Sequence, residues 1–262
     1  MDRNFDGIAP RFKRNIYNSA KGQLRLAVLR RDFAEFLPIG EKLRVLDAGG
    51  GQGQFALELA GAGHELVLTD ISGEMLELAR ANAASLPAEV QGRVEIVQSP
   101  LQELKLALGT NQTPFDLVMC HAVIEWLKEP EMLAASMEPL VGSGGYFSLV
   151  FYNLDGMIFK NLLRTNFKKI QRQDYTGFRG SLTPTNPLRL EQVRTWLEDA
   201  GFEEICCSGI RVFHDYIFNA ADRVREPETL QEMELAFSRQ LPYRDLGRYI
   251  HILCRKPATV GS

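Results

Sequence analysis

The sequence predicts an α/β fold in which a largely parallel sheet carries helices on both faces. Short runs rich in Val, Leu, Ile and Phe recur along the chain, and segments with the apolar spacing of a helix separate most of them. A glycine-rich turn joins the first of these runs to the first helical segment. Strands that alternate with helices favour a parallel sheet, because each helical crossover returns the chain to the same edge.

Seven segments are predicted to be strands. The helix after the first strand carries Phe55 and Leu59 four residues apart. Ser72 is the predicted N-cap of the next helix, because a serine side chain can accept a hydrogen bond from the first helical turn. Further helices are predicted near 129–140 and at 190–200. The predicted strands are 43–47, 65–69, 94–98, 115–120, 145–151, 202–212 and 248–255.

Length and composition fit one domain with added segments. The chain has 262 residues, of which 45% are hydrophobic, enough to build a core of this class. No signal peptide or long apolar run is visible, so we expect neither export nor membrane insertion, and a cytoplasmic location. The expected parts are an N-terminal helical segment (1–40), a cofactor-binding core (41–152), an insertion after the fifth strand (153–190), and a C-terminal helix with the final strands (191–257).

The cysteines give no sign of a metal site or of disulfide bonds. All four fall in predicted strands, where buried free thiols are the expected state in a reducing compartment. Their spacing does not match a zinc site, so no metal is assigned. They are Cys120, Cys206, Cys207 and Cys254.

The segment Val45 to Gly53, VLDAGGGQG, predicts a ligand site. A strand runs into Asp47 and then into three alternate glycines before the next helix begins. Glycine permits a tight turn and lets a ligand lie against the main chain, where a Cβ would collide. The following helix directs free N–H groups at the same place. This combination predicts a nucleotide-like cofactor.

Two classes of cofactor compete, beside a purely structural glycine turn. Gly51, Gly53 and Ala56 fit G-x-G-x-x-A, a dinucleotide pattern whose ribose-binding acid would be Asp70, about 20 residues on. From Asp47 onward the segment is D-x-G-x-G-x-G, which resembles the first motif of Rossmann-like S-adenosylmethionine methyltransferases. That cofactor needs one acid near its ammonium and another for its ribose, and Asp47 and Asp70 suit those tasks. The last two strands, with no ordinary crossover between them, fit the antiparallel final hairpin of that fold.

Positive charge is concentrated in two segments outside the core. Residues 1–31 have a net charge of +6 and residues 154–190 a net charge of +5, whereas the whole chain has −3. Additions of this kind lie near the carboxyl ends of the strands, where ligands bind. A basic rim with interleaved aromatic residues favours a polyanionic substrate such as RNA. Solvated helix faces are the alternative interpretation.

The sequence resembles one family along nearly its whole length. NFDGIAPRFKRNIY, KGQLR, LRVLDAGGGQGQ, CHAVIEW, FYN, RVFHDY and LGRYIHI are similar to segments of bacterial tRNA 5-carboxymethoxyuridine methyltransferases. The glycine loop is common to many methyltransferases, but the pairs KRNIY with KGQLR and RVFHDY with LGRYIH are more specific. The resemblance implies a Rossmann-like class I methyltransferase. It also implies transfer of a methyl group from S-adenosylmethionine to the carboxylate of 5-carboxymethoxyuridine at the wobble position in the tRNA anticodon loop, giving the methyl ester.

The resemblance also implies which residues contact the cofactor. Arg25 would pair with the methionine carboxylate, a task suited to a planar guanidinium. His121 would lie beside the methionine moiety, although a histidine at a strand end is otherwise commonly structural. One departure is Pro100, which removes a backbone donor beside the adenine position. The full predicted set is Arg25, Asp47, Gly49, Gly50, Gly51, Asp70, Leu101, Gln102 and His121.

The implied chemistry needs no general base. A carboxylate with a pKa of about 4 is already ionised at neutral pH, so the enzyme must mainly align it and exclude water. Cations and hydroxyls should hold it. The candidates are Arg14, Tyr17, Tyr152, Asn153, Arg211 and His214, with Arg14, Tyr152 and Arg211 the strongest.

The insertion 153–190 is long for a simple connection and predicts a substrate lid. Its first part, GMIFKNLLRTNFKKI, has a mostly helical apolar pattern, with basic residues that would face the tRNA. The predicted tRNA-binding residues are Lys13, Lys21, Arg164, Lys168, Lys169 and Arg172.

Three other functions stay open on the sequence. A methyltransferase of a small carboxylic acid or quinone-like metabolite would not need the basic rim. A nucleotide-dependent oxidoreductase would not need Asp47 before the glycines. A non-catalytic tRNA-binding protein would not need Asp47, the glycines and Asp70 together.

Overall fold

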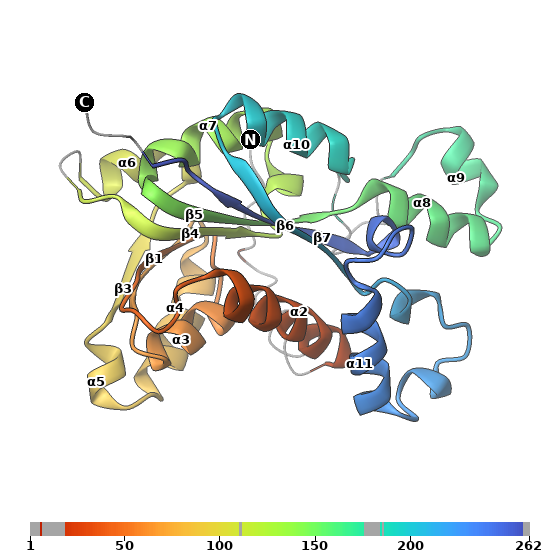
Figure 1. The fold of residues 1–262 in the computed structure, drawn as a ribbon, viewed down its shortest axis with the longest axis horizontal. Coiled ribbons are helices and arrows are strands. Elements are labelled where there is room, and N and C mark those ends of the chain that lie inside the picture. Colours follow the sequence, from red (N-terminus) through yellow and green to blue (C-terminus); the bar gives the residue numbers. More distant parts are fainter. Residues whose placement is uncertain (1–5, 7–18, 110–111, 176–183, 185, 259–262) are drawn as a thin grey trace.

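The computed structural model describes Asp6 and residues 19–109, 112–175, 184 and 186–258. Its centre is a seven-stranded sheet with the strand order β3-β2-β1-β4-β5-β7-β6 (Figure 1). β1 to β5 run parallel, and β7 lies antiparallel between β5 and β6. This confirms the predicted fold class, including the antiparallel final pair. The strands are β1 (Arg44–Ala48), β2 (Glu65–Asp70), β3 (Val94–Gln98), β4 (Phe115–His121), β5 (Val141–Tyr152), β6 (Glu203–Ile210) and β7 (Tyr249–Arg255).

Helices cover both faces of the sheet (Figure 1). One face carries α2 (Ala20–Phe36), α3 (Gln54–Gly61) and α4 (Gly73–Ala84), and the other carries α6 (Leu104–Ala107), α7 (Leu133–Met137) and α10 (Leu190–Asp199). The short α5 (Ala88–Gln91) precedes β3. Beyond the sheet lie α8 (Leu154–Leu163) and α9 (Phe167–Gln171), while α11 (Pro227–Phe237) packs beside α2.

Alternating side chains in the central strands build a core on each face. Val45 and Leu66 join the cluster beneath α2, α3 and α4, whereas their neighbours Leu46 and Val67 join the opposite cluster. All four are nearly or fully buried. Each such side chain contributes about 1.5–3 kcal/mol of hydrophobic free energy. A central parallel strand therefore reads as a continuous apolar run.

Two helical predictions needed correction. The helix expected near 129–140 is three short pieces, because Pro130 begins one 3-10 turn and Pro139 is the second residue of another, on either side of α7. The pattern across 157–170 is two helices rather than one, and Thr165 between them has a left-handed φ of 57°. The predicted N-cap at Ser72 is confirmed, since its hydroxyl accepts a hydrogen bond from the Met75 N–H at 3.2 Å.

α11 was not predicted, because the side chain that it buries is polar. Pro227 begins it, and its buried side chain is Glu234, whose carboxylate accepts hydrogen bonds from the N–H groups of Val212, Phe213 and His214. Those amides belong to the turn after β6, so α11 holds that turn in place. A hydrophobic pattern cannot reveal a helix that is attached through a carboxylate.

The sheet order creates a crevice at one edge. β1 is flanked by β2 on one side and by β4 on the other. The strands that follow β1 are therefore added first on one side of it and then, from β4 onward, on the other. Loops at the carboxyl ends of such strands diverge and leave room for a ligand. The glycine loop, Asp70 and His121 all follow or end these three strands.

Candidate active site

A pocket lies at the carboxyl ends of β1, β2 and β4 and is closed on one side by α2. Its wall combines glycine main chain, two acids, one arginine and several apolar side chains. It is lined by Gly22, Arg25, Leu26, Leu29, Asp47, Gly49, Gly50, Gly51, Gln54, Phe55, Asp70, Ile71, Met75, Ser99, Pro100, Leu101, His121, Ala122, Val123, Trp126, Leu127 and Tyr249.

The glycine loop is held against β2 by its own main chain. The N–H groups of Gly49 and Gly50 both donate to the Thr69 carbonyl at 2.9 Å. The Gly51 N–H donates to Asp70 Oδ2 at 2.9 Å, while Asp70 Oδ1 accepts from the Ser72 N–H at 2.8 Å. Gly51 has a φ of +58°, which favours glycine. Asp70 therefore ties the loop to the start of α4 and still lines the pocket.

Asp47 and Arg25 set the electrostatics of the pocket. Burial raises the pKa of the Asp47 carboxyl to about 7, Arg25 opposes this rise, and the charge of Asp70 adds to it. Burial likewise raises the pKa of Asp70, against the hydrogen bonds from the amides of Ser72 and Gly51. Two acids whose negative charge is poorly compensated create a site for a bound cation. Arg25, reaching in from α2, provides a separate site for an anion.

The structure brings together most of the predicted cofactor residues. Arg25, Asp47, Gly49, Gly50, Gly51, Asp70, Leu101 and His121 all line the pocket, but Gln102 is exposed and does not. Pro100 also lines it, so the departure noted from the sequence lies at the site. Sequence reasoning missed Gly22 and Phe55, which also line the pocket. Gly22 lies three residues before Arg25 on α2, and that spacing could have indicated a shared helix face.

A second group of charges, which we name the cation cluster, comprises Lys160, Arg211, Asp215 and Arg248. Asp215 is at its centre: Lys160 Nζ lies 3.2 Å from Oδ2, Arg211 Nη1 3.7 Å from Oδ1 and Arg248 Nε 3.8 Å from Oδ2. Burial alone would raise the pKa of Asp215, but His214 and these cations hold it well below its usual range. Three cations face one carboxylate, so the cluster can accept a further anion.

Aromatic rings connect the cation cluster to the pocket. The Arg211 guanidinium lies 5.4 Å and that of Arg25 5.9 Å from the centroid of the Tyr249 ring, which lines the pocket. Arg248 lies 4.5 Å above the Tyr152 ring, and the two tyrosine rings are 5.4 Å apart. The Tyr152 hydroxyl is buried and has no hydrogen-bond partner among the described residues. It is therefore an unpaired buried donor within the described part of the chain, although Tyr152 does not itself line the pocket.

Glu125 is a further buried acid that sequence reasoning did not single out. Its side chain is fully buried, and neither carboxylate oxygen has a hydrogen-bond partner in the described part of the chain. Burial raises its pKa to about 8, against the influence of nearby main-chain amides and of Arg25. Burial also raises the pKa of the Tyr249 hydroxyl. At neutral pH Glu125 is therefore mainly protonated.

Two predicted substrate residues make structural contacts. The Asn153 amide donates to the carbonyls of Asp245 and Gly247 at 2.7 and 2.8 Å, and its oxygen accepts from the Asp155 N–H at the start of α8. His214 is buried, with Nδ1 3.1 Å from Asp215 Oδ1. Asn153 thus caps α8 and joins it to the segment before β7, and His214 contacts Asp215, while their contact with the substrate stays a prediction.

The remaining predicted residues fall into two groups. Arg14, Tyr17 and Lys13 lie outside the described residues. Lys21 is exposed at the start of α2, and burial of its stem lowers the pKa of its ammonium, against the charge of Asp215. On the predicted lid, Arg164, Lys168 and Arg172 are exposed and Lys169 is partly buried.

No arrangement of histidine, cysteine and acidic side chains able to hold a metal ion occurs among the residues with described positions. The four cysteines are buried and free. In the same part of the chain, no helix combines the length and apolar character needed to cross a membrane.

Comparison with known proteins shows the fold and the family of this chain. Residues 46–149 match the family model described as a methyltransferase domain. The solved magnesium protoporphyrin IX methyltransferase of Synechocystis is 18% identical and superposes with a TM-score of 0.63 over 96% of each chain. This likeness shows the fold. The family match, together with the relative described next, shows that the chain is an S-adenosylmethionine-dependent methyltransferase.

A relative with a named activity identifies the family. The tRNA 5-carboxymethoxyuridine methyltransferase of Escherichia coli K12 is 40% identical over 261 residues, which cover 98% of this chain and 97% of the relative. This protein belongs to the family of tRNA 5-carboxymethoxyuridine methyltransferases. By contrast, a ubiquinone biosynthesis O-methyltransferase of Alkalilimnicola ehrlichii is 32% identical over 119 residues, 45% of each chain.

Proposed function

We propose that this protein transfers a methyl group from S-adenosylmethionine to the carboxylate of 5-carboxymethoxyuridine at the tRNA wobble position, forming the methyl ester, in the cytoplasm. One observation carries the proposal: the 40% identity to a relative with that named activity extends over 98% of the chain. It therefore includes the segments outside the cofactor-binding core, where a methyltransferase selects its substrate.

The pocket fits S-adenosylmethionine. A Cβ at Gly49 would lie 2.6 Å from Val123 Cγ2, and one at Gly50 would overlap the Asp47 carboxylate, so the wall at these positions is bare main chain. We assign the ammonium of the cofactor to Asp47, its carboxylate to Arg25 and its ribose hydroxyls to Asp70. Leu101 and Pro100 lie where the adenine would be held. Gln102 is not assigned a direct contact.

The bound cofactor supplies a methyl group on a positively charged sulfur. One oxygen of the substrate carboxylate forms a bond to that carbon as the carbon–sulfur bond breaks, and no proton is transferred. The protein therefore needs no general base. Its task is to hold the carboxylate close to the pocket and to exclude water.

The cation cluster is the proposed carboxylate site. Arg211 and Arg248 each lie almost 4 Å from Asp215, so neither is committed to a tight ion pair. The buried Tyr152 hydroxyl offers a hydrogen bond from the end of β5. Lys160 adds positive charge, although burial lowers its pKa to about 8 while Asp215 opposes that effect. A carboxylate shared among several donors keeps a lone pair free to attack.

We propose that the lid formed by α8 and α9 contacts the anticodon loop. Both helices project beyond the sheet (Figure 1), and Lys160 on α8 is part of the cation cluster. Arg164, Lys168 and Arg172 are exposed, and Phe167 is an exposed aromatic side chain between them. Cations paired with an exposed ring suit phosphates and an unstacked base. Lys21 is placed to add a phosphate contact from α2.

The test is methylation with labelled S-adenosylmethionine, comparing tRNA from cells that lack this protein with tRNA that lacks 5-carboxymethoxyuridine. We expect label only in the first pool and its release by mild base, as for a methyl ester. Label in neither pool, with cofactor binding intact, would contradict the proposal and would indicate a small carboxylic acid as the acceptor.

A further inference from the structure

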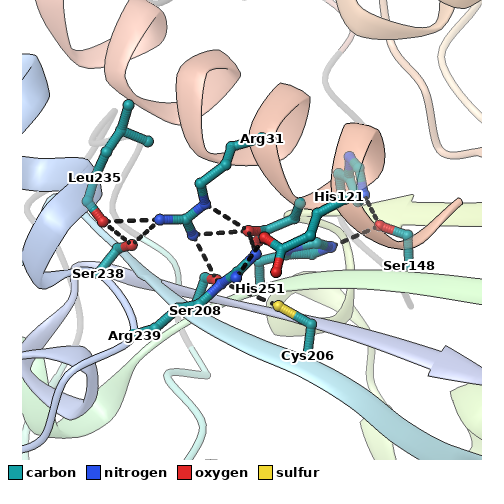
Figure 2. A network of polar contacts seen from close by, with 11 residues as sticks. Arg31, His121, Ser148, Cys206, Ser208, Leu235, Ser238, Arg239 and His251 are labelled. Carbon is teal, nitrogen blue, oxygen red and sulfur yellow. Dashed lines mark hydrogen bonds and ion pairs between the residues drawn. The ribbon is translucent and has the colours of Figure 1, made fainter.

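A line of polar side chains crosses the sheet beneath α2 (Figure 2). It begins at His121 on β4, continues through Ser148 on β5 and His251 on β7, and ends at Asp32 on α2. His121 Nε2 lies 2.7 Å from Ser148 Oγ, which lies 3.0 Å from His251 Nε2, and His251 Nδ1 lies 2.7 Å from Asp32 Oδ2. Ser148, His251 and Asp32 are fully buried, whereas His121 also lines the pocket.

Asp32 determines the direction of the hydrogen bonds. Its Oδ1 accepts from Arg31 at 2.7 Å and from Arg239 at 2.6 Å. Burial alone would raise its pKa, but the hydrogen bond with His251 and the charge of Arg31 hold that pKa well below its usual range. Asp32 is therefore an anion that can only accept, and the proton it faces must be on His251 Nδ1.

The charges around His251 balance without a charge on its ring. Asp32 and Glu35 already pair with the two arginines: Arg31 and Arg239 both contact Asp32, and Arg239 also contacts Glu35. The other polar group in register with His251 is Ser208, which is uncharged. A third buried cation would leave the group unbalanced, at a high desolvation cost. A neutral His251 that is protonated on Nδ1 has a bare Nε2, which must accept the Ser148 proton.

The positions of the protons on Ser148 and His121 follow from this arrangement. Ser148 has one proton and gives it to His251, so its oxygen accepts from His121, and the His121 proton lies on Nε2. Burial, with the positive charge of Arg25, lowers the pKa of His121 well below its ordinary value, which leaves the ring neutral. Its Nδ1 therefore has a free lone pair, and it has no hydrogen-bond partner among the described side chains and amides.

We propose that Asp32, His251 and Ser148 are positioning residues that fix His121 in the Nε2–H tautomer, so that Nδ1 offers an acceptor to the ammonium of the cofactor. The chemistry of the pocket agrees, because Asp47 is a second acceptor in the same wall and Arg25 takes the opposite charge. The other tautomer would direct an N–H at the ammonium and repel it. The inference rests on the cofactor assigned above and not on the RNA substrate.

Histidine ring nitrogens can be read directly by two-bond hydrogen–nitrogen NMR correlations on the labelled, ligand-free protein. We expect the Nε2–H pattern for His121 and the Nδ1–H pattern for His251 from pH 6.5 to 8. His64 is an internal standard, because its Nδ1 accepts from the Leu43 N–H at 3.2 Å and its proton must lie on Nε2. A Nδ1–H or doubly protonated His121 would overturn the proposal.

A matched pair of variants tests the link to the cofactor. Ser148→Ala cuts the line, whereas Ser208→Ala removes an equally buried hydroxyl that contacts Arg31 and Arg239 but not His121. Calorimetry would compare S-adenosylmethionine with 5′-methylthioadenosine, which lacks the amino-acid end. We expect Ser148→Ala to weaken the first ligand by at least about fivefold and the second by less than about twofold, with Ser208→Ala changing neither ligand by more than about twofold.

An equal loss for both ligands in Ser148→Ala, or the same selective loss in Ser208→Ala, would show a general structural role and overturn the proposal. If Ser148→Ala does not fold, the tautomer of His121 measured in the unaltered protein still tests the proposal. A failed tRNA methylation assay leaves both measurements valid, so the two proposals fail independently.

Discussion

The cofactor pocket and the cation cluster adjoin each other but are built in opposite ways. The pocket takes its polar groups mainly from two strand-to-helix turns, Asp47 to Gly53 and Asp70 to Ser72, and from main-chain amides. The cation cluster takes its charges from α8, from the turn after β6 and from the residue before β7. The pocket has under-compensated acids, whereas the cluster has surplus cations. The difference separates binding of a cationic donor from capture of an anionic acceptor.

The largest effect is expected at Arg211, which also has strained backbone, with a left-handed φ of 59°. Truncating a buried charged contact typically costs about 2–5 kcal/mol, so Arg211→Ala should lower kcat/KM for modified tRNA by about a hundredfold while the Kd for S-adenosylmethionine changes less than about twofold. Steady-state kinetics and calorimetry check this. Arg189→Ala, which breaks an exposed ion pair with Asp155, is the control. Lost cofactor affinity would place Arg211 in the pocket instead.

A separate comparison uses the strain at Arg211. Glycine adopts a left-handed φ without penalty, so Arg211→Gly should be more stable than Arg211→Ala by about 1 kcal/mol, although both lack the side chain. Thermal unfolding at one pH measures the difference. Equal stability would mean that the backbone relaxes out of this conformation in the alanine variant.

A smaller effect is expected at Gly50, where a substitution should weaken cofactor binding and not tRNA binding. A Cβ there would overlap the Asp47 carboxylate and displace it. Overpacking of this kind costs about 1–3 kcal/mol, so Gly50→Ala should weaken S-adenosylmethionine binding by about thirtyfold and leave the affinity for tRNA unchanged. Gly61→Ala is the control, because a Cβ at Gly61 meets nothing within 4 Å. Equal losses in both variants would contradict a specific role for the bare main chain.

The pocket should also respond to pH. The pKa of Asp47 is raised to about 7 in the folded protein, and the ammonium of the cofactor favours the ionised carboxylate. Affinity should therefore fall by up to about tenfold for each pH unit below 7. Calorimetry from pH 5.5 to 8.5 checks this, and Asp47→Asn should bind weakly with little pH dependence. A wild-type profile as flat as that of the variant would contradict the assignment.

The same shift predicts how the ligand-free protein responds to pH. Because the folded pKa lies above the unfolded value of 3.8, the contribution of Asp47 to stability is present below pH 4 and is lost as pH rises towards 7. Asp47→Asn should remove that part of the decline. Parallel unfolding curves for the two proteins from pH 4.5 to 7.5 would contradict it.

The smallest effect is expected on the lid. Lys168→Glu with Lys169→Glu should weaken tRNA binding by about fivefold at low salt, with a shallower salt dependence, and leave cofactor affinity unchanged. Lys42→Glu with Arg93→Glu is the matched control, because these residues precede β1 and β3 and so lie at the amino ends of the strands, away from the pocket at their carboxyl ends. Unchanged tRNA affinity in the first pair would remove the lid from the RNA interface.

The success of the strand predictions and the failure at α11 have the same cause. Strands such as 65–69 and 115–120 were recognisable because their burial follows local apolar runs. α11 is attached through Glu234 to amides 20 to 22 residues earlier in the chain, and no local pattern records such a bond. The helix at 129–140 failed because Pro130 and Pro139 were given too little weight.

The sequence by itself determined the α/β fold, the glycine loop, and the chemical types of the groups in the pocket. Those features depend on periodicity and on turns of a few residues, so each is encoded where it occurs. Only the tertiary structure decided that Arg248 and Lys160 share Asp215 with Arg211, that Glu125 is buried without a partner, and that Asp32 reaches His121 through two other strands. These pairings depend on the order and register of strands far apart in the chain, because it is the sheet that brings their side chains within hydrogen-bonding distance.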